Sequence, residues 1–168
     1  VLYSARRWGQ STDKRIAVIG QGAIGLSFTM IAERTGAKQV IGIDLLDYRL
    51  NKARELGATH TINADRENVV EALADVTKGE GVDVVVDASA DPDGLNQAVS
   101  LVNMYGTIIG FSQIPRDQLP TFRHPDWMMK EARIIATGSS LSQTPTEAIQ
   151  TMVDLRDRGW LDPSVLIT

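Results

Sequence analysis

Hydrophobic residues occur along this chain in two alternating patterns. Short runs rich in Ile and Val predict six strands, at 15–19, 39–43, 60–63, 82–87, 106–110 and 134–137. Between the runs, apolar residues recur every three or four positions. That spacing predicts helices at 23–34, 47–56, 67–77, 93–104, 126–131 and 146–158. The alternation indicates βαβ units. We therefore expect an α/β Rossmann fold, a doubly wound, six-stranded parallel sheet with helices on both faces.

This architecture predicts where a site should lie. The near-continuous valine run at 82–87 is typical of a strand buried on both faces of a parallel sheet. In such sheets, ligands bind outside the carboxyl ends of the strands, where the winding direction reverses. We therefore expect functional residues in the turns after Ile19, Ile43, Val86 and Ile109.

Composition excludes several classes of protein. The net charge of −4 and the sequence pI near 5.1 argue against a nucleic-acid partner. There is no cysteine, and His60 and His124 have no metal-ligand neighbours at useful spacing, so we assign no metal site. No apolar run approaches the roughly 18 residues of a membrane span, and no signal peptide is recognisable. We expect a cytoplasmic protein without a membrane partner.

The turn after the first predicted strand reads GQGAIG and opens a predicted helix, the context in which this glycine pattern is informative. Gly20 allows a sharp turn, Gly22 lets a pyrophosphate approach the backbone, and Gly25 lets the helix close on the strand. The N–H groups at Ala23 and Ile24 then face the phosphates. A plain tight turn is the alternative interpretation.

An acid at the end of the second strand extends this pattern. Asp44 lies 19 residues after Gly25, close to the spacing of about 20 expected of a ribose-binding carboxylate. Such a carboxylate repels the 2′-phosphate of NADP, which favours NAD. Arg49, one helical turn further on, leaves NADP open as the less favoured cofactor. A solvated acid or a helix cap is the alternative for Asp44.

At these residues the chain resembles the nucleotide-binding domain of the medium-chain dehydrogenase/reductase superfamily, the zinc-type alcohol dehydrogenases and their relatives. The resemblance covers nearly the whole chain. An Arg-Leu-x-x-Ala helix followed by Leu-Gly-Ala-Thr is its most specific part. The segments that carry it, besides Asp44, are 16–25, 49–53, 55–59, 79–87 and 106–110.

The resemblance implies which residues contact the cofactor. Asp44 matches the ribose-binding acid, with Leu45 next to it, and Arg49 matches a basic residue beside the adenosine ribose. Two further segments match stretches near the cofactor, the second beside its nicotinamide half. They are Ala88, Ser89 and Ala90, and Gly110, Phe111 and Ser112. Thr137–Ser139 matches further nicotinamide contacts more loosely.

The resemblance also implies an activity and partners. It indicates the NAD(P)-binding domain of a zinc-type alcohol or polyol dehydrogenase acting on a small alcohol, aldehyde or polyol. Residues 1–12 would end a helix that leads in from a separate catalytic domain, and residues 13–168 would form the dinucleotide-binding domain. Zinc and the catalytic residues would lie in that other domain, so this chain alone would be inactive. The edge strand around 134–136 would form a homodimer.

Two alternatives remain open from the sequence. One is a non-catalytic NAD-binding module, and the other is a methyltransferase that binds S-adenosylmethionine. The helix-closing Gly25 and the Leu-Gly-Ala-Thr run argue against the methyltransferase. The apolar run at 165–168 predicts a further strand.

Overall fold

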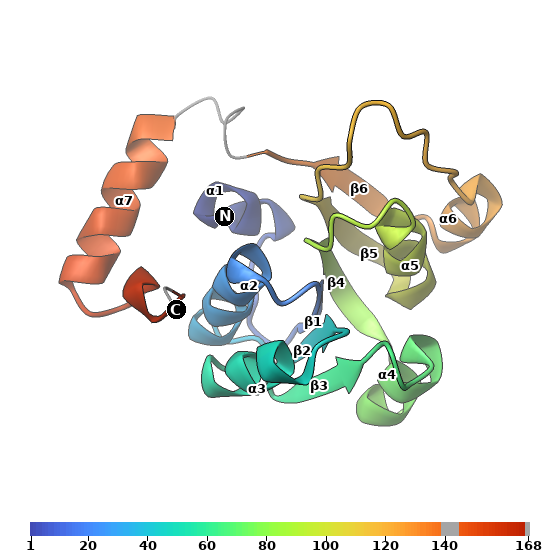
Figure 1. The fold of residues 1–168 in the computed structure, drawn as a ribbon, viewed down its shortest axis with the longest axis horizontal. Coiled ribbons are helices and arrows are strands. Elements are labelled where there is room, and N and C mark those ends of the chain that lie inside the picture. The colour runs from blue at the N-terminus through green and yellow to red at the C-terminus, as the bar shows by residue number, and fades with distance from the viewer. Residues whose placement is uncertain (139–144, 167–168) are drawn as a thin grey trace.

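Six parallel strands form the sheet of this protein, seen in a computed structural model that describes residues 1–138 and 145–166 (Figure 1). The strand order is β3-β2-β1-β4-β5-β6. Successive strands are added in one direction from β1 to β3 and in the other from β4 to β6, so the topological switch point lies between β1 and β4. The predicted α/β Rossmann fold is therefore confirmed. The strands are β1 (Arg15–Ile19), β2 (Gln39–Asp44), β3 (His60–Asn63), β4 (Val82–Asp87), β5 (Val102–Gly110) and β6 (Arg133–Ala136).

Helices cover both faces of the sheet. One face packs against α1, α2 and α3, and the other packs against α4, α5 and α6. The last long helix, α7, stands beside the sheet next to α1 (Figure 1). The helices are α1 (Leu2–Ala5), α2 (Ala23–Arg34), α3 (Asp47–Glu55), α4 (Val69–Thr77), α5 (Gly94–Leu101), α6 (His124–Lys130) and α7 (Pro145–Asp157).

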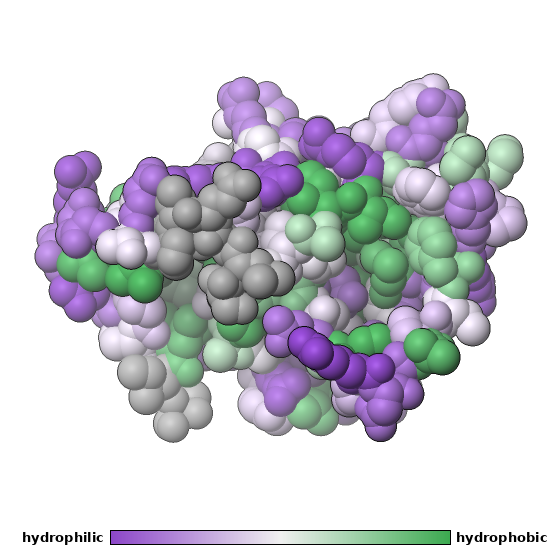
Figure 2. All heavy atoms as spheres, turned by 90° about the horizontal axis from the view of Figure 1, so that it is seen from above, coloured by the Kyte–Doolittle hydropathy of each residue, from purple (hydrophilic) through white to green (hydrophobic). Residues whose placement is uncertain are grey.

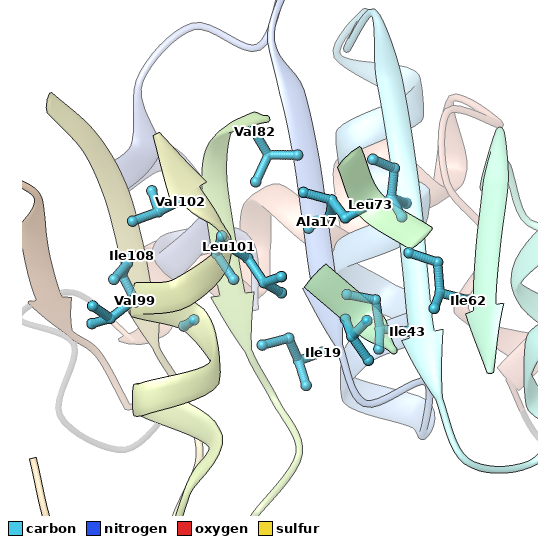
Figure 3. Close-up of a cluster of buried hydrophobic side chains, with 14 of the residues drawn as sticks. Ala17, Ile19, Ile43, Ile62, Leu73, Val82, Val99, Leu101, Val102 and Ile108 are labelled. Atoms are coloured by element: carbon cyan, nitrogen blue, oxygen red, sulfur yellow. The ribbon is translucent and has the colours of Figure 1, made fainter. Parts of the chain in front are cut away.

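The strands contribute mainly Ile and Val side chains to the core, and these alternate between the two faces of the sheet. In β4, Val85 packs toward α4 and α5, while Val84 and Val86 pack toward α2. Figure 3 shows the hydrophobic cluster between the sheet and helices α4 and α5, with Leu73 of α4 and Val99 of α5 close to strand residues. Burying one such side chain contributes about 1.5–3 kcal/mol. The prediction of a valine strand buried on both faces is confirmed.

The predicted helix at 93–104 is too long at its C-terminal end. α5 ends at Leu101, and β5 begins at Val102, whose partner in the sheet is Val82. Pairing with β4 therefore overrides the helical spacing of apolar residues in this stretch. The register shifts between Val82 and Val84, and Tyr105 has a φ of +61°. This irregularity explains why the sequence pattern misplaces the start of the strand.

The structure also differs from the sequence prediction at the start of α4, at the start of α6, which lies at His124 and not at residue 126, and in the C-terminal run. α4 begins at Val69 because the Asn68 side chain caps it, accepting hydrogen bonds from the backbone N–H groups of Val70 and Glu71. The strand predicted for 165–168 is wrong in its described part, because Pro163–Leu166 forms a 3-10 turn. Residues 167–168 of that run lie outside the described residues.

The described surface adds two observations. Figure 2, a view from above Figure 1, shows apolar residues in several places on this face, the broadest group near its centre, with polar residues around and between them. None of the helices in 1–138 and 145–166 has the length and apolar character needed to span a membrane.

Candidate cofactor-binding site

The glycine turn that joins β1 to α2 has space for side chains at only one of its three glycines. Gly20 has a φ of +85°, and an added Cβ would lie 2.7 Å from the carbonyl oxygen of Ala88. An added Cβ at Gly25 would overlap the carbonyl oxygen of Gly20. At Gly22, by contrast, no heavy atom lies within 4 Å of that position. Gly22 therefore borders open space, which a ligand can enter.

The start of α2 offers hydrogen-bond donors to this space. Gly22 is the N-cap and supplies no side-chain cap, and Ala23 and Ile24 are exposed. Backbone N–H groups in the first turn of a helix have no partner within the helix. Together with the positive end of the helix dipole they favour an anion such as a phosphate.

Asp44 ends β2 beside the glycine turn, with its side chain largely buried. One carboxylate oxygen, Oδ2, accepts a hydrogen bond from the Gln21 backbone N–H at 2.6 Å, and Oδ1 accepts one from the Leu46 N–H at 3.0 Å. Arg49 Nη1 lies 3.6 Å from Oδ2. A carboxylate has about four acceptor positions, so capacity remains for the hydroxyl groups of a ribose.

Arg49 stays charged under all ordinary conditions. Its pKa is raised, first by a hydrogen bond to the Tyr48 hydroxyl and then by the charge of Asp44. The Arg49 side chain is 40% exposed, so its guanidinium can also reach a phosphate group of a ligand. Asp44 and Arg49 thus present opposite charges at the same position.

The Gln21 side chain is a structural part of the site that sequence reasoning missed. It is fully buried. Its Nε2 donates to the Val18 carbonyl at 2.9 Å, and its Oε1 accepts from the Thr29 hydroxyl at 3.0 Å. These bonds fix the turn between β1 and α2 and aim the Gln21 N–H at Asp44. The glycine pattern leaves this position open, so it gives no signal of that role.

One cavity of about 230 Å³ brings many of the predicted residues together. It lies at the carboxyl ends of β1, β2 and β4, and so includes the switch point between β1 and β4. Ala23, Ile24, Gly25 and Ala90 are close in sequence but do not line it. The predicted residues that line it are Gly20, Gly22, Asp44, Leu45, Arg49, Ala88 and Ser89, and Ala64, Asp91 and Gln97 join them.

A second cavity, of about 260 Å³, lies further along the same edge of the sheet. Gly110 and Ser112 line it, and Asp91 lines both cavities. The Phe111 ring points elsewhere, because it packs edge-on against Phe28 with ring centroids 5.4 Å apart. Ser139, which falls in the looser nicotinamide match, lies outside the described residues.

The described part of the chain does not fit a zinc site. Within residues 1–138 and 145–166, no three His, Cys, Asp or Glu side chains come close enough to hold a metal ion. A larger cavity of about 370 Å³ lies between α1 and α7, lined mostly by apolar side chains. It lacks the glycine turn and the carboxylate, so the two cavities at the carboxyl edge are the better candidates.

Comparison with known proteins identifies relatives of this chain. A curated L-threonine 3-dehydrogenase from Caldanaerobacter subterraneus subsp. tengcongensis is 38% identical over 114 residues, which are 67% of this chain and 32% of that protein. The chain thus spans about a third of the length of this relative.

Solved structures of dehydrogenases share the fold of this chain. An alcohol dehydrogenase zinc-binding domain protein from Burkholderia ambifaria superposes with a TM-score of 0.85 and 27% identity, covering 96% of this chain and 44% of that one. A zinc-binding dehydrogenase from Sinorhizobium meliloti 1021, bound to NADP, has a TM-score of 0.83 and 25% identity, covering 96% and 46%. The sequence model of a family described as zinc-binding dehydrogenase matches residues 23–157. The chain therefore belongs to the zinc-binding dehydrogenase family.

Proposed function

We propose that this chain binds NAD at the carboxyl edge of its sheet and serves as the cofactor-binding part of an NAD(P)-dependent dehydrogenase. A single observation carries the proposal: one cavity joins the open space at Gly22 to the carboxylate of Asp44. The pyrophosphate would sit at Gly22 and the start of α2, and the adenosine ribose would donate hydrogen bonds to Asp44. The nicotinamide half would extend toward Gly110 and Ser112.

We propose NAD as the favoured cofactor because the Asp44 carboxylate would repel a 2′-phosphate. Arg49 opposes this preference, since its guanidinium lies 3.6 Å from Asp44 and could pair with that phosphate. The solved neighbour from Sinorhizobium meliloti is bound to NADP. NADP is therefore the second cofactor to test.

The bound cofactor would supply the acceptor or donor of a hydride, and the residues of this chain would bind and orient it. We propose a small alcohol, aldehyde or polyol as the substrate of the whole protein. Zinc would belong to a part of that protein outside the described residues, if the enzyme uses it. We accordingly propose that this chain alone has no dehydrogenase activity.

Calorimetric titration of the 168-residue chain with NADH, NADPH and S-adenosylmethionine tests the proposal. We expect NADH to bind most tightly, NADPH more weakly and S-adenosylmethionine not at all. Tight binding of S-adenosylmethionine alone would contradict the proposal and favour a methyltransferase. A dehydrogenase assay of the whole protein with alcohols and polyols separates an enzyme from a non-catalytic NAD-binding module.

Three further proposals concern the organisation of the protein. Residues 13–168 would form the dinucleotide-binding domain, with residues 1–12 as an attached helical segment whose Leu2 and Trp8 pack in the same cluster as α2. β6 lies at the edge of the sheet, and an unpaired edge can pair with another chain. We propose a cytoplasmic homodimer through that edge, and sedimentation analysis would contradict it by finding only monomers.

A further inference from the structure

Asp87, at the end of β4, is a buried carboxylate whose Oδ1 accepts three hydrogen bonds. The donors are the Ser89 backbone N–H at 3.1 Å, the Ser89 hydroxyl at 2.7 Å and the Ser112 hydroxyl at 2.6 Å. The backbone carbonyl of Asp87 also accepts from the N–H groups of Phe111 and Ser112, at 3.0 and 2.9 Å. One residue thus joins the loop after β4 to the turn after β5.

Both serine hydroxyls also accept hydrogen bonds from backbone N–H groups in the loop after β4. The Ser112 hydroxyl accepts a hydrogen bond from the Ala90 N–H at 2.9 Å, and the Ser89 hydroxyl accepts one from the Asp91 N–H at 3.1 Å. A hydroxyl has one proton, so donating it to Asp87 leaves its lone pairs for the backbone N–H. Asp87 therefore sets the direction of both hydroxyls. We call Asp87, Ser89 and Ser112 the Asp87 clamp.

The clamp holds a strained segment that is itself exposed, and the start of α5 packs tightly against the clamp. Ala90 has a φ of +59°, a conformation that non-glycine residues rarely adopt and that persists where surrounding contacts enforce it. The hydrogen bond from its N–H to Ser112 is such a contact. α5 begins against the clamp: an added Cβ at Gly94 would lie 2.6 Å from the Ser89 hydroxyl and 2.7 Å from Asp87 Oδ1.

The clamped loop separates the two cavities at the carboxyl edge. Ala88, Ser89 and Asp91 line the first cavity, and Asp87, Asp91 and Ser112 line the second. The loop also contacts the end of β1, directly before the glycine turn, because the Ala88 N–H donates to the Ile19 carbonyl at 2.9 Å. Moving this loop would therefore change where the two cavities lie relative to each other.

We propose that Asp87 is a positioning residue for the cofactor. Through the hydroxyls of Ser89 and Ser112 it fixes the loop at 88–91, so that the two halves of one dinucleotide fit the two cavities together. This inference rests on the proposed function. It assigns Ser89 and Ser112 a role within the protein, where the family resemblance gave them only a place near the cofactor.

The test compares a ligand that spans both cavities with one that fills only the first. NADH and AMP are titrated into the 168-residue chain and its Asp87→Asn and Ser112→Ala variants, with Ser100→Ala as the matched control. Ser100 is exposed on α5 and lines neither cavity. We expect both clamp variants to bind NADH about tenfold more weakly, to bind AMP with less than about a threefold change, and to keep the circular dichroism of the folded chain.

A double variant tests the strain at Ala90 directly. Glycine adopts positive φ without steric cost, so Ala90→Gly should restore most of the NADH affinity that Ser112→Ala loses. Equal weakening of NADH and AMP, unchanged binding of both, or no restoration by Ala90→Gly would overturn the positioning role. If the unaltered chain binds no NADH, the proposed function itself fails and this inference fails with it.

Discussion

Gly22 and Gly25 belong to one short motif, yet the structure predicts opposite effects for the same substitution. Gly25→Ala would place a methyl group against the Gly20 carbonyl oxygen, so the turn must shift. Overpacked positions typically cost about 1–3 kcal/mol of stability, and we expect a loss of about 3 kcal/mol or more here, because the contacted backbone cannot move aside as a flexible side chain can. Urea unfolding followed by circular dichroism measures this loss.

Gly22→Ala should leave the fold intact and damage binding. The added methyl meets no atom of the protein, and the backbone at Gly22 has an ordinary φ of −72°. The free energy of unfolding should change by less than about 1 kcal/mol, which covers the difference between Gly and Ala at an N-cap. NADH affinity should fall at least about tenfold because the methyl occupies the path of the pyrophosphate. Unchanged affinity would show that no phosphate lies there.

Asp44→Ala tests the cofactor preference. The variant loses the acceptor for the ribose hydroxyls and the repulsion of a 2′-phosphate, while Arg49 remains. We expect NADH affinity to fall about tenfold or more, since hydrogen bonds to charged groups contribute about 1.5–3 kcal/mol. NADPH affinity should fall less or rise. Equal weakening of both would mean that Asp44 acts only by holding the Gln21 and Leu46 N–H groups.

At the scale of elements, the sequence pattern predicts the bounds of some strands and misses those of others. Strands such as β1 and β4 are predicted to the residue, because a fully buried run of Ile and Val has few alternatives in a parallel sheet. The start of β5 is misplaced, because Val102 is apolar in either interpretation and its contact with Val82 is distant in sequence. The type of an element can be predicted from the residues within it. The start of β5, by contrast, depends on a contact with a residue that is distant in the sequence.

The start of α3 carries a pH-dependent contact. Asp47 accepts hydrogen bonds from the Asn63 amide and from Arg66, both at 2.6 Å, and these lower its pKa from 3.8. A lowered pKa in the folded state means that the ionised form stabilises the fold at neutral pH. This contribution is lost as the pH falls below about 4 through the folded-state pKa.

Asp47→Asn should therefore unfold at lower urea concentration than the unaltered chain at about pH 7. The difference between the two midpoints should shrink as the pH falls from about 4 to 3. The effect is modest because the Asp47 side chain is exposed to solvent. A difference that stays constant over this pH range would assign it to a cause other than the carboxylate charge.

Across the whole molecule, the candidate site is assembled from segments that are far apart in the sequence. The glycine turn and Asp44 are predictable because each has a recognisable type and spacing within one βαβ unit. The Asp87 clamp is not, because its partners, Ser89 and Ser112, meet only after β4 and β5 pair. The sequence marks Asp87 as a strand-end acid in a turn where functional residues are expected, but it does not identify its hydrogen-bond partners. Long-range register therefore decides the part of the site that motifs leave open.

Phe28 connects the core of the molecule to this site. Its ring is fully buried in α2, 6.0 Å from the Trp8 ring and 5.4 Å from the Phe111 ring, measured between centroids. Trp8 precedes the first strand. Phe111 lies in the turn after β5, and its neighbours Gly110 and Ser112 line the second cavity. Three segments distant in the sequence thus share one aromatic cluster.

Phe28→Ala should affect stability and binding together. Truncating a buried Phe costs about 3–5 kcal/mol, a large share of the roughly 5–15 kcal/mol that stabilises a typical domain. We expect a clear drop in the urea midpoint with an unchanged m-value, and weaker NADH binding because Phe111 loses its neighbour. Leu119→Ala, at a side chain 92% exposed, is the control and should change stability by less than about 0.5 kcal/mol. If Phe28→Ala lowers stability but leaves NADH affinity unchanged, the aromatic cluster supports the fold without supporting the site.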